Sequence, residues 1–512
     1  MIFLLLQIVQ PNRLPHLYEK CYNFLLKASK YLLQPAFNSF NNALHQPDVE
    51  QERLKTKIIR CLIHTRYGQS LGITKESSWS AIPVVSYDDF FPWLQQQQTT
   101  PKQSIITKEK IRSWQQTSGS AGASKQIPYT HGLLTAFTFM FAVWAYDLLH
   151  HGPDFRTGKT YACVSPTFGD RPGGIDDTDY LTGPLRWLSG LFLVRVGNHF
   201  PDGDTFRWAL ALALLQNPDL EIVSLWSPTF LTVQLIFMTQ HRHALIAALG
   251  DRLDKTRRKA LEIDPIDWLK IWPKLKLISC WDQLFAREQA RALQTYFPGV
   301  FIQGKGLLAT EAPITIPLIK AGGFVPLVNQ IVLEFMAADG TIVDLCEVQT
   351  GQIYQLIIST PGGLYRYRLG DRLQVSHWYA KTPCLALVGR GDRVSDLVGE
   401  KLTEEFVAEI FNNLGLVNNT DLCCLVPVPG SQPHYALYLS HKAMMAIAGD
   451  KSTLAQQIDN GLQRSFHYRR ARQLAQLGPV QVITDNCPPW LTQGRWGDEK
   501  SYCLRIPSAG TD

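Results

Sequence analysis

Apolar residues recur three or four positions apart near the start of the chain, as at Leu54 and Ile58. This spacing gives a helix one apolar face and predicts helices over residues 15–45 and 49–66. Farther on, the stretch from Leu133 to Leu149 is almost continuously apolar, which predicts a buried helix.

Beyond residue 160, short strand-like runs alternate with helical ones. Strands are predicted at residues 161–164, 220–225, 275–280 and 300–303, with helices from about Thr232 and through Gln289 and Leu293. Such alternation predicts an α/β layout in which helices cover the sheets. The pattern then becomes purely β, with strands predicted at residues 331–335, 353–359, 373–377 and 385–388.

A second α/β pattern begins at Glu404. It predicts helices at 404–414 and near 454–474, and strands at 422–428, 435–439 and 480–483. We place the domain boundary between Arg390 and Leu402, a stretch rich in glycine and charge that could serve as a hinge. The predicted fold class is α/β. A large N-terminal domain, residues 1–392, has helix-covered β-sheets with a β-barrel-like portion, and a hinge joins it to a small, mobile α+β domain, residues 393–512.

Composition limits the kind of protein that these elements build. The 512 residues are 45% hydrophobic and 18% charged, which is typical of a folded chain long enough for two domains. The net charge of +6 is small for this length and the sequence has no long Lys/Arg tract, so nucleic acid is not an expected partner.

The cysteines and the N-terminal residues indicate in which cellular compartment the protein is expected. The ten cysteines contain no CxxC pair, which argues against a zinc site and a disulfide framework and favours reduced thiols in the cytoplasm. The apolar run from Ile2 to Leu6 is too short to span a bilayer, so we expect no stable membrane insertion, with loose membrane contact as an open alternative. The oligomeric state stays unknown.

The segment with the most chemical information is the polar loop from Thr117 to Lys125, TSGSAGASK. Its glycines and small hydroxyl residues let backbone N–H groups approach phosphate oxygens, and the lysine supplies a mobile cation. The loop lacks the ending of a Walker A motif, and Ser120 is not in a GxSxG nucleophile elbow. Taken alone, it fits a flexible linker as well as a phosphate site.

A second glycine-lysine segment is set aside. Residues 152–160 end in Gly158-Lys159-Thr160, but five residues separate the two glycines and the segment runs into a predicted strand. In a phosphate-binding P-loop the strand comes before the loop and a helix follows it.

Three later segments combine glycines with charged residues: residues 304–311, 365–371 and 389–393. In the first, Glu311 could hold Mg²⁺ against phosphates and Thr310 could donate a hydrogen bond to one of them. In the second, Asp371 could accept hydrogen bonds from both hydroxyls of a ribose. Taken alone, the first segment is weak evidence. An arginine-rich strand closed by a Gly-Asp turn is the better interpretation of the second, and a plain charged turn is the alternative for the third.

Together and in this order, the four segments resemble the adenylate-forming superfamily. The resemblance narrows to the auxin-responsive-promoter acyl acid amido synthetases, the Gretchen Hagen family, in its bacterial-type branch. It extends over nearly the full chain and includes Ala43 to Gln51, His64 to Gly68, Thr117 to Thr130, Trp226 to Leu231, Cys280-Trp281, Gly304 to Glu311, Gly363 to Asp371, Gly389 to Glu404 and Gly494 to Leu504.

The resemblance implies a ligase that uses ATP and Mg²⁺ to activate a carboxylic acid as an acyl-adenylate and passes the acyl group to an amino acid or another amine. Matched motif to motif, it implies a phosphate loop made by Ser118, Gly119, Ser120, Ala121, Gly122 and Lys125. Thr310 and Glu311 would meet the phosphates, with Glu311 on the metal, and Asp371 would hold the ribose with Arg390 nearby.

A lysine near the C-terminus reaches the active site in this family, and Lys500 is the matching position. Lys500 and Lys125 would be the catalytic cations. Because lysines are mostly exposed, the alternative for Lys500 is a solvated surface residue.

The chain departs from the family pattern in two ways. Many relatives have a tyrosine four residues before the motif glutamate, where this chain has Leu307, so an aromatic contact with the nucleotide is not implied there. The plant enzymes that conjugate hormones are also longer, so hormone substrates do not carry over.

An acyl pocket is expected between the helix at 133–146 and residues 226–231, which suits a hydrophobic acid. Its candidate lining residues are Phe137, Phe141, Trp226 and Phe230, each with plain core packing as the alternative. The cluster His467 to Arg472 is interpreted as a solvated helix face that could also hold coenzyme A. Two rival functions stay open: an acyl-CoA ligase with the same first step, and a non-catalytic acyl- or nucleotide-binding protein.

Overall fold

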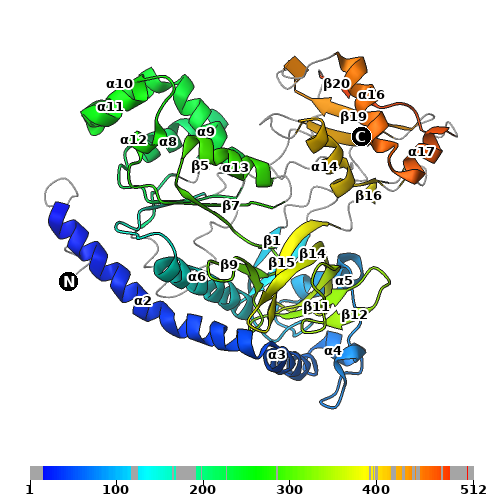
Figure 1. Ribbon diagram of the computed structural model, residues 1–512. Helices are drawn as coiled ribbons and strands as arrows, with labels where there is room; N and C mark the ends of the chain where they lie inside the picture. Colours follow the sequence, from blue (N-terminus) through cyan, green and yellow to red (C-terminus); the bar gives the residue numbers. More distant parts are fainter. Residues whose placement is uncertain are drawn as a thin grey trace.

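The computed structural model describes residues 15–116, 125–163, 167–168, 192–197, 199–226, 228–283, 286–390, 394–395, 397, 400, 402–416, 423–428, 433–440, 444–445, 450–473, 477–484 and 504. Figure 1 shows a large N-terminal domain and a smaller C-terminal domain, as the predicted fold class requires.

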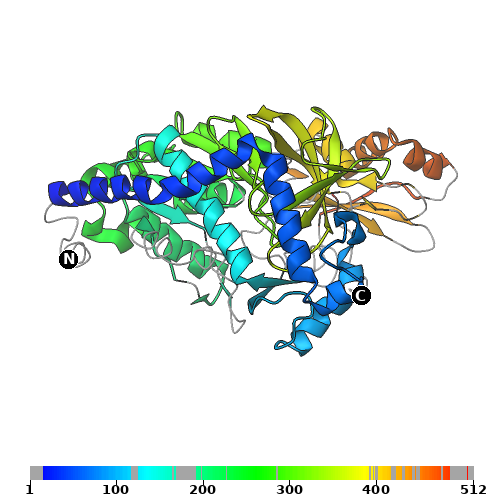
Figure 2. The same ribbon diagram turned by 90° about the horizontal axis from the view of Figure 1, so that it is seen from below.

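Two long helices open the described chain: α2 (Pro15–His45) and α3 (Pro47–Leu62). Both predicted helices are confirmed, although the second ends earlier than expected. Pro47 sits at the start of α3, where its missing N–H costs nothing. Helix α2 runs across α6 (His131–His151), and Figure 2 shows the two from below.

Four parallel strands form the central sheet: β3 (Thr160–Ala162), β6 (Ile222–Ser224), β7 (Leu277–Cys280) and β8 (Phe301–Gly304). They lie in the order β3-β6-β7-β8 and coincide with the four strands predicted from the sequence. Helices α8 (Gly203–Leu215), α9 (Pro228–Gln240), α10 (Arg242–Leu249), α11 (Lys255–Glu262), α12 (Trp268–Ile271) and α13 (Ala286–Tyr296) connect or flank them.

Alternate residues of these strands face two different cores. Val223 and Ile278 belong to the cluster built with α8, α9 and α13. Their neighbours Ile222 and Leu277 point to the opposite face, where they pack near Leu148 of α6. Because side chains alternate along a strand, the residues in phase with Ile222 also face α6, and they define one side of the site described below.

A five-stranded antiparallel sheet follows, in the order β12-β11-β13-β14-β15. Its strands are β11 (Val332–Met336), β12 (Ile342–Asp344), β13 (Ile353–Ser359), β14 (Tyr367–Tyr379) and β15 (Thr382–Arg390), and the pair β9 (Thr315–Leu318) and β10 (Gly323–Pro326) adjoins them. The predicted β region is confirmed. Strand β14 begins earlier than the predicted strand at 373–377, so Asp371 lies within it.

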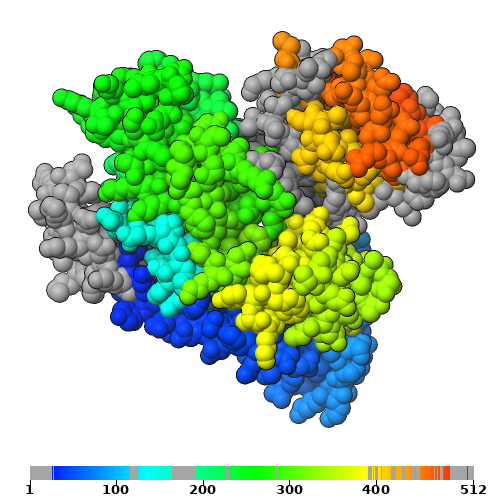
Figure 3. All heavy atoms as spheres, in the orientation of Figure 1, coloured from blue at the N-terminus to red at the C-terminus, as the bar shows by residue number. Residues whose placement is uncertain are grey.

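The C-terminal domain has its own core. A three-stranded sheet, β18 (Cys423–Val428), β19 (His434–Leu439) and β20 (Gln481–Ile483), packs with α14 (Glu404–Asn413), α16 (Lys451–Leu462) and α17 (Phe466–Gln473). Figure 3 shows these residues gathered in one lobe.

The single helix predicted near 454–474 is wrong, because the structure has two helices with a turn at residues 463–465. The turn brings the Tyr468 hydroxyl within 2.8 Å of Asp459 Oδ1, and Arg472 Nε lies 2.9 Å from the same oxygen. Tyr468 and Ala471 are buried, so the prediction of a solvated face is wrong for these two residues. Apolar spacing continues through such a turn and does not reveal it.

A helix and a hairpin before α6 were not predicted. Helix α5 (Tyr87–Thr99) contains the glutamine run and begins with a capping box between Ser86 and Asp89. Strands β1 (Ile111–Gln116) and β2 (Gln126–Thr130) form an antiparallel hairpin around the polar loop. Among the described helices, α6 is long and apolar enough to cross a membrane, but more than half of its apolar window is buried inside the protein.

Candidate functional site

The carboxyl ends of the parallel strands meet at one edge of the central sheet, where open α/β sheets bind ligands. Trp226 follows β6 and Trp281 follows β7, and the Trp281 N–H donates to the Trp226 carbonyl over 2.8 Å. Lys305 follows β8, and its Nζ lies 2.8 Å from Ser224 Oγ and 4.5 Å from the centre of the Trp226 ring. These contacts place a cation and two aromatic rings at the sheet edge.

Thr310 and Glu311 form the tip of a tight turn just beyond that edge. The backbone groups of Ala309 and Ala312 are hydrogen-bonded to each other in both directions, at 3.1 and 3.2 Å. The Tyr129 hydroxyl on β2 donates to the Thr310 carbonyl over 2.8 Å. Glu311 is only 5% exposed, so its carboxylate lies within the protein beside β2 and not on a free surface loop.

Lys125 directly precedes β2, the strand that carries Tyr129. Its Nζ lies 5.4 Å from the centre of the Tyr87 ring, and the Tyr87 hydroxyl accepts a hydrogen bond from the Gln126 N–H over 2.9 Å. The pairing of Gln116 with Gln126 brings the two ends of the predicted phosphate loop together. The loop residues themselves, Ser118, Gly119, Ser120, Ala121 and Gly122, lie outside the described residues.

Asp371 is buried in β14, where its backbone faces Arg390 of β15. A side-chain contact joins this sheet to the edge of the parallel one, because the Leu387 N–H on β15 donates to Gln283 Oε1 over 2.7 Å. The structure therefore brings the end of β7 near the strands that carry Asp371 and Arg390.

Arg366 belongs to the segment at residues 365–371 that also contains Asp371, and its side chain has a structural role. Its guanidinium binds both carboxylate oxygens of buried Glu334, at 2.8 and 3.0 Å. Its φ of 43° is unusual for a residue with a side chain, and the ion pair holds it in place.

Asp282 was missed by the sequence analysis, which stopped at Cys280-Trp281. It lies at the end of β7, and its Oδ1 is buried with no hydrogen-bond partner among the described residues. Burial raises the pKa of Asp282, while its own backbone N–H and the nearby Arg287 oppose that rise. A Cβ at Gly304 would lie 2.2 Å from Asp282 Oδ1, so the carboxyl fills the space that the glycine leaves. The sequence signal that could have pointed to Asp282 is Gly304, the glycine that ends β8.

An apolar cavity of about 280 Å³ lies between α6 and the α6-facing side of the sheet. Of the four candidate acyl-binding residues, Phe141 and Trp226 line it. Phe137 instead stacks on Tyr129 in the core, with ring centres 5.9 Å apart, and Phe230 packs near Phe206 in the helical core. The cavity occupies the expected region on the α6 side but does not reach Phe230.

Lys500 also lies outside the described residues. Farther along the same tail, Leu504 forms a parallel β-bridge with Leu425 of β18. This bridge places Leu504 beside β18 of the C-terminal domain.

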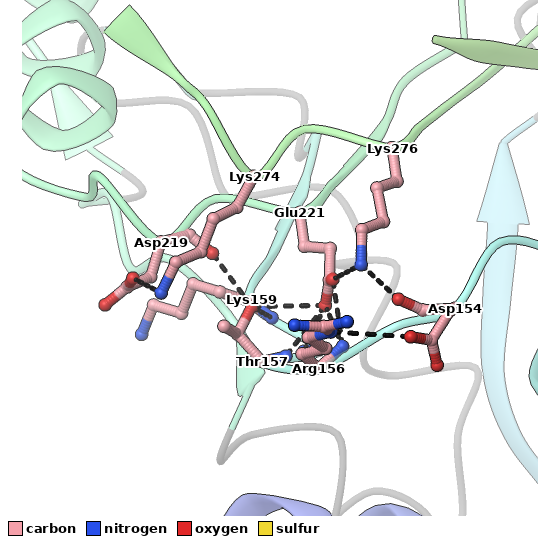
Figure 4. Close-up of polar contacts among 9 residues, drawn as sticks. Asp154, Arg156, Thr157, Lys159, Asp219, Glu221, Lys274 and Lys276 are labelled. Carbon is pink, nitrogen blue, oxygen red and sulfur yellow. Dashed lines mark hydrogen bonds and ion pairs between the residues drawn. The ribbon is translucent and has the colours of Figure 1, made fainter. Parts of the chain in front are cut away.

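The glycine-lysine segment that was set aside lies at the opposite edge of the sheet. Figure 4 shows Glu221 surrounded by this loop, and its carboxylate accepts the N–H groups of Arg156, Thr157 and Gly158 at 2.8 to 3.0 Å. Lys276 Nζ lies 2.9 Å from the same carboxylate. The Glu221 carboxylate already accepts the hydrogen bonds that these N–H groups would have to donate to a phosphate. This explains why the loop is not a phosphate site.

Family models match three consecutive parts of the chain. The GH3 family N-terminal domain matches residues 36–302, the central domain 324–390 and the C-terminal domain 401–485. The chain belongs to the GH3 family. The resemblance to the Gretchen Hagen synthetases is thereby confirmed, and the segments that carry Glu221, Asp371 and Leu425 belong to three different modules of that family.

Curated GH3 relatives are named as ligases that join acids to amino groups. The indole-3-acetic acid-amido synthetase GH3.4 of Arabidopsis thaliana is 22% identical over 85% of this chain and 84% of its own. The 4-substituted benzoates-glutamate ligase GH3.12 of the same plant is 22% identical over 76% of this chain and 78% of its own.

Solved structures show the same fold. The AtGH3.15 acyl acid amido synthetase in complex with 2,4-DB has a TM-score of 0.75 at 18% identity, covering 92% of this chain and 94% of that one. A 2-hydroxyisobutyryl-CoA ligase in complex with 2-HIB-AMP has a TM-score of 0.55 at 13% identity, covering 90% and 89%. GH3 chains and an acyl-CoA ligase thus share this two-domain α/β architecture.

Proposed function

We propose that this GH3 chain uses ATP to convert a carboxylic acid into an acyl-adenylate and then transfers the acyl group to the amine of an amino acid. One observation carries the proposal. The apolar cavity ends at the same strand end, after β8, from which the Thr310–Glu311 turn projects, so an acid in the cavity would present its carboxylate toward that turn. Family membership supplies the reaction class.

In the first half-reaction, the carboxylate oxygen attacks the α-phosphorus of ATP and pyrophosphate leaves. Thr310 and Glu311 would face the phosphates, and Lys125, at the end of the loop at 117–125, would place its charge where negative charge builds up. Asp371 would accept hydrogen bonds from the ribose hydroxyls, with Arg390 beside it.

Mg²⁺ would arrive with ATP as part of the substrate. Glu311 fits such an ion because its carboxylate is a hard oxygen donor, and Mg²⁺ in nucleotide sites uses one or two carboxylates together with phosphates. When bound, the ion would neutralise charge on the phosphates.

In the second half-reaction, a neutral amine attacks the acyl carbonyl and AMP leaves. Adenylate is a good leaving group, so this step needs positioning more than a strong base. We propose that the C-terminal domain, from residue 393, rotates about residues 390–402 to bring Lys500 to the site for the first step and to open a path for the amine in the second.

The partners and the cellular location that we expect from the sequence are part of this proposal. The partners are a small carboxylic acid and an amino acid or another amine, and the expected location is the cytoplasm. Among the described residues, no disulfide bond joins the cysteines.

The test is ATP–pyrophosphate exchange that depends on an added acid, followed by mass spectrometry of the products with mixed amino acids. We expect exchange and an acyl-amino acid product. A thioester formed only with coenzyme A would replace the amide assignment by the ligase, and no exchange with any aryl, indolyl or fatty acid would overturn the adenylation proposal.

Variants test the site assignment in the same assay. Glu311→Ala is expected to abolish turnover that depends on Mg²⁺, and Asp371→Ala to raise the half-saturating ATP concentration. Glu52→Ala is the control, because Glu52 is an exposed residue of α3 that pairs with Lys55. Wild-type rates in both site variants would show that these carboxylates do not serve the reaction.

A further inference from the structure

A second cavity lies in the layer of helices that covers the face of the parallel sheet away from α6. Its walls are the first turns of α8 and the far end of α9, with His241 directly after α9. Figure 1 shows these two helices on the side of the sheet opposite α6. The cavity has a volume of about 480 Å³, within the roughly 300–1,000 Å³ that small-molecule sites usually have.

This cavity is remote from the strand ends where the substrates are proposed to bind. Helix α9 begins at Pro228, just beyond the end of β6, and ends at Gln240. At about 1.5 Å per residue, the two ends of the helix lie roughly 18 Å apart. A ligand at the far end of α9 is therefore outside the proposed reaction site.

Hydrogen bonds hold the two walls of the cavity in place. Gln234 Nε2 on α9 donates to the Arg207 carbonyl on α8 over 2.9 Å, and Gln234 is buried. The Thr205 N–H in the first turn of α8 donates to Asp202 Oδ1 over 2.7 Å, which caps the helix. The side chains that line the cavity thus project from helices whose relative position is fixed.

Aromatic rings form one wall. The His241 ring stacks on buried Phe237, with ring centres 4.2 Å apart, and the Trp208 indole meets His241 edge to face at 6.4 Å. His241 Nδ1 lies 3.0 Å from the Phe237 carbonyl, which can only accept, so Nδ1 donates and Nε2 is an acceptor in the neutral ring. These rings offer an apolar surface on which another aromatic ring can pack.

Two opposite charges stand beside these rings. The Arg207 guanidinium lies over the Phe237 ring, with Cζ 5.4 Å from the ring centre, and forms an ion pair with Asp204 one turn earlier. The Arg207 side chain is 25% exposed and that of Asp204 is 77% exposed, so the cation belongs to the wall and the anion to the rim.

This pair of charges selects for a ligand that carries both signs. An ion pair one turn apart on a helix is common and by itself marks no site, but Arg207 and Asp204 line the same cavity as Trp208. A ligand with a single charge would meet a like charge as well as an opposite one. A ligand with an adjacent carboxylate and ammonium is complementary to both residues.

We infer that this cavity binds a free aromatic α-amino acid. The carboxylate lies against Arg207, the ammonium against Asp204, and the aromatic ring against Trp208 and His241. Because the cavity is remote from the strand ends, it is a second amino acid site, in addition to the one that the proposed reaction requires.

Calorimetric titration of the full chain, without ATP or acid, tests this site. Phenylalanine is the probe, and three matched compounds each lack one feature: phenylalaninamide lacks the carboxylate, N-acetylphenylalanine lacks the ammonium and alanine lacks the ring. Phenylalanine is expected to bind. Each of the other three should bind at least about tenfold more weakly, because each loses a charged hydrogen bond or the ring contact. No binding of phenylalanine, or equal binding of phenylalanine and alanine, would overturn the inference.

Variants assign the binding to this cavity. Arg207→Gln should weaken phenylalanine binding at least about tenfold and leave phenylalaninamide binding unchanged, since the amide has no carboxylate for Arg207 to hold. Asp204→Asn should weaken phenylalanine binding and leave N-acetylphenylalanine binding unchanged. Because Asp204 is exposed, this variant tests the site even if Arg207→Gln alters the packing of α8. Arg53→Gln is the control, since Arg53 forms an ion pair of the same spacing with Glu50 on α3.

Phenylalanine binding that both cavity variants leave unchanged would place the amino acid elsewhere and overturn the inference. An equal loss for phenylalanine and its amide in Arg207→Gln would also contradict the assigned contact. Acid-dependent ATP–pyrophosphate exchange is the separate measure of the proposed function, so its failure would overturn that proposal and leave the binding result intact.

Discussion

Two buried carboxyl groups stand at opposite edges of the parallel sheet, and their surroundings differ. Glu221 is surrounded by hydrogen-bond donors: three backbone N–H groups and the Lys276 ammonium. Asp282 has one oxygen with no partner among the described residues. The first arrangement stabilises a charge and the fold around it, whereas the second leaves a buried acceptor without a partner among the described residues, at the strand ends where we propose that the substrates bind.

Glu221→Gln tests the structural carboxylate. The substitution keeps the shape but removes the charge that strengthens its hydrogen bonds, so the free energy of unfolding should fall by about 1.5–3 kcal/mol. Asp219→Asn is the matched control, because the Asp219 carboxylate forms a half-exposed ion pair with Lys274 and such pairs contribute about 0–1 kcal/mol. Urea unfolding measures both, and equal effects would contradict the structural role.

Asp282→Asn tests the carboxyl at the opposite edge through pH. Burial raises the pKa of Asp282 in the folded protein above its ordinary value of 3.8, so the folded state holds this proton more tightly than the unfolded state. The wild-type protein should therefore lose stability from this residue as pH rises through the interval between the two pKa values.

Asparagine does not titrate, so the stability of the variant relative to wild type should increase from acidic to neutral pH. Urea unfolding of both proteins across that range is the measurement. A stability difference that stays constant with pH would show that Asp282 ionises in the folded state as it does in the unfolded chain.

At this scale, motifs in the sequence selected Glu311 and Asp371 as candidate site residues. The structure buries both side chains, and their roles stay predictions. Lys305 was within a quoted motif but was not selected, because its contacts are with Ser224 and Trp226, which precede it by about eighty residues. Strand parity and spatial neighbours decide such contacts, and a single sequence shows neither.

At the scale of elements, the hairpin β1–β2 and the turn at residues 309–312 act as one unit. Tyr129 connects them through its hydrogen bond to the Thr310 carbonyl, and its ring stacks on Phe137 of α6. The strand that follows the loop at 117–125 is thereby fixed to the turn that carries Glu311. This contact fixes the distance between the turn at residues 309–312 and the strand that follows the loop at 117–125, two segments that are proposed to contact the phosphates.

Tyr129→Phe removes that hydrogen bond and keeps the stacked ring. We expect the half-saturating ATP concentration to rise by no more than about tenfold, because a neutral hydrogen bond contributes about 0.5–1.5 kcal/mol. Tyr354→Phe is the control, since the Tyr354 hydroxyl accepts a hydrogen bond from Gln349 in a loop of the antiparallel sheet. Unchanged ATP dependence in Tyr129→Phe would mean that the turn keeps its position without this contact.

Periodicity predicted most described strands and the long helices, because each has a regular apolar pattern. It missed the hairpin at 111–130, since β1, Ile111 to Gln116, carries mostly polar residues. It also missed the break between α16 and α17, where the buried contact from Tyr468 to Asp459 decides the geometry. Elements that depend on tertiary contacts cannot be predicted from the local pattern of apolar residues.

At the scale of the whole molecule, the three largest apolar cores among the described residues support three parts of the chain. One core joins the antiparallel sheet with α6, a second joins the parallel sheet with α8 to α13, and a third fills the C-terminal domain. The candidate site lies where the first two meet. Lys125, Glu311 and Asp371 are far apart along the chain, so the sequence predicts their assembly through family resemblance and not through spacing.

The central claim is that the acid becomes an acyl-adenylate before it meets the amine. An acid whose carboxylate carries the heavy oxygen isotope tests this directly, because one carboxylate oxygen attacks the α-phosphorus and stays on AMP when the amine breaks the bond between that oxygen and the acyl carbon. We predict that mass spectrometry finds one heavy oxygen in each AMP released with the amide product. Amide formed with unlabelled AMP, or with ADP and labelled phosphate, would contradict the account.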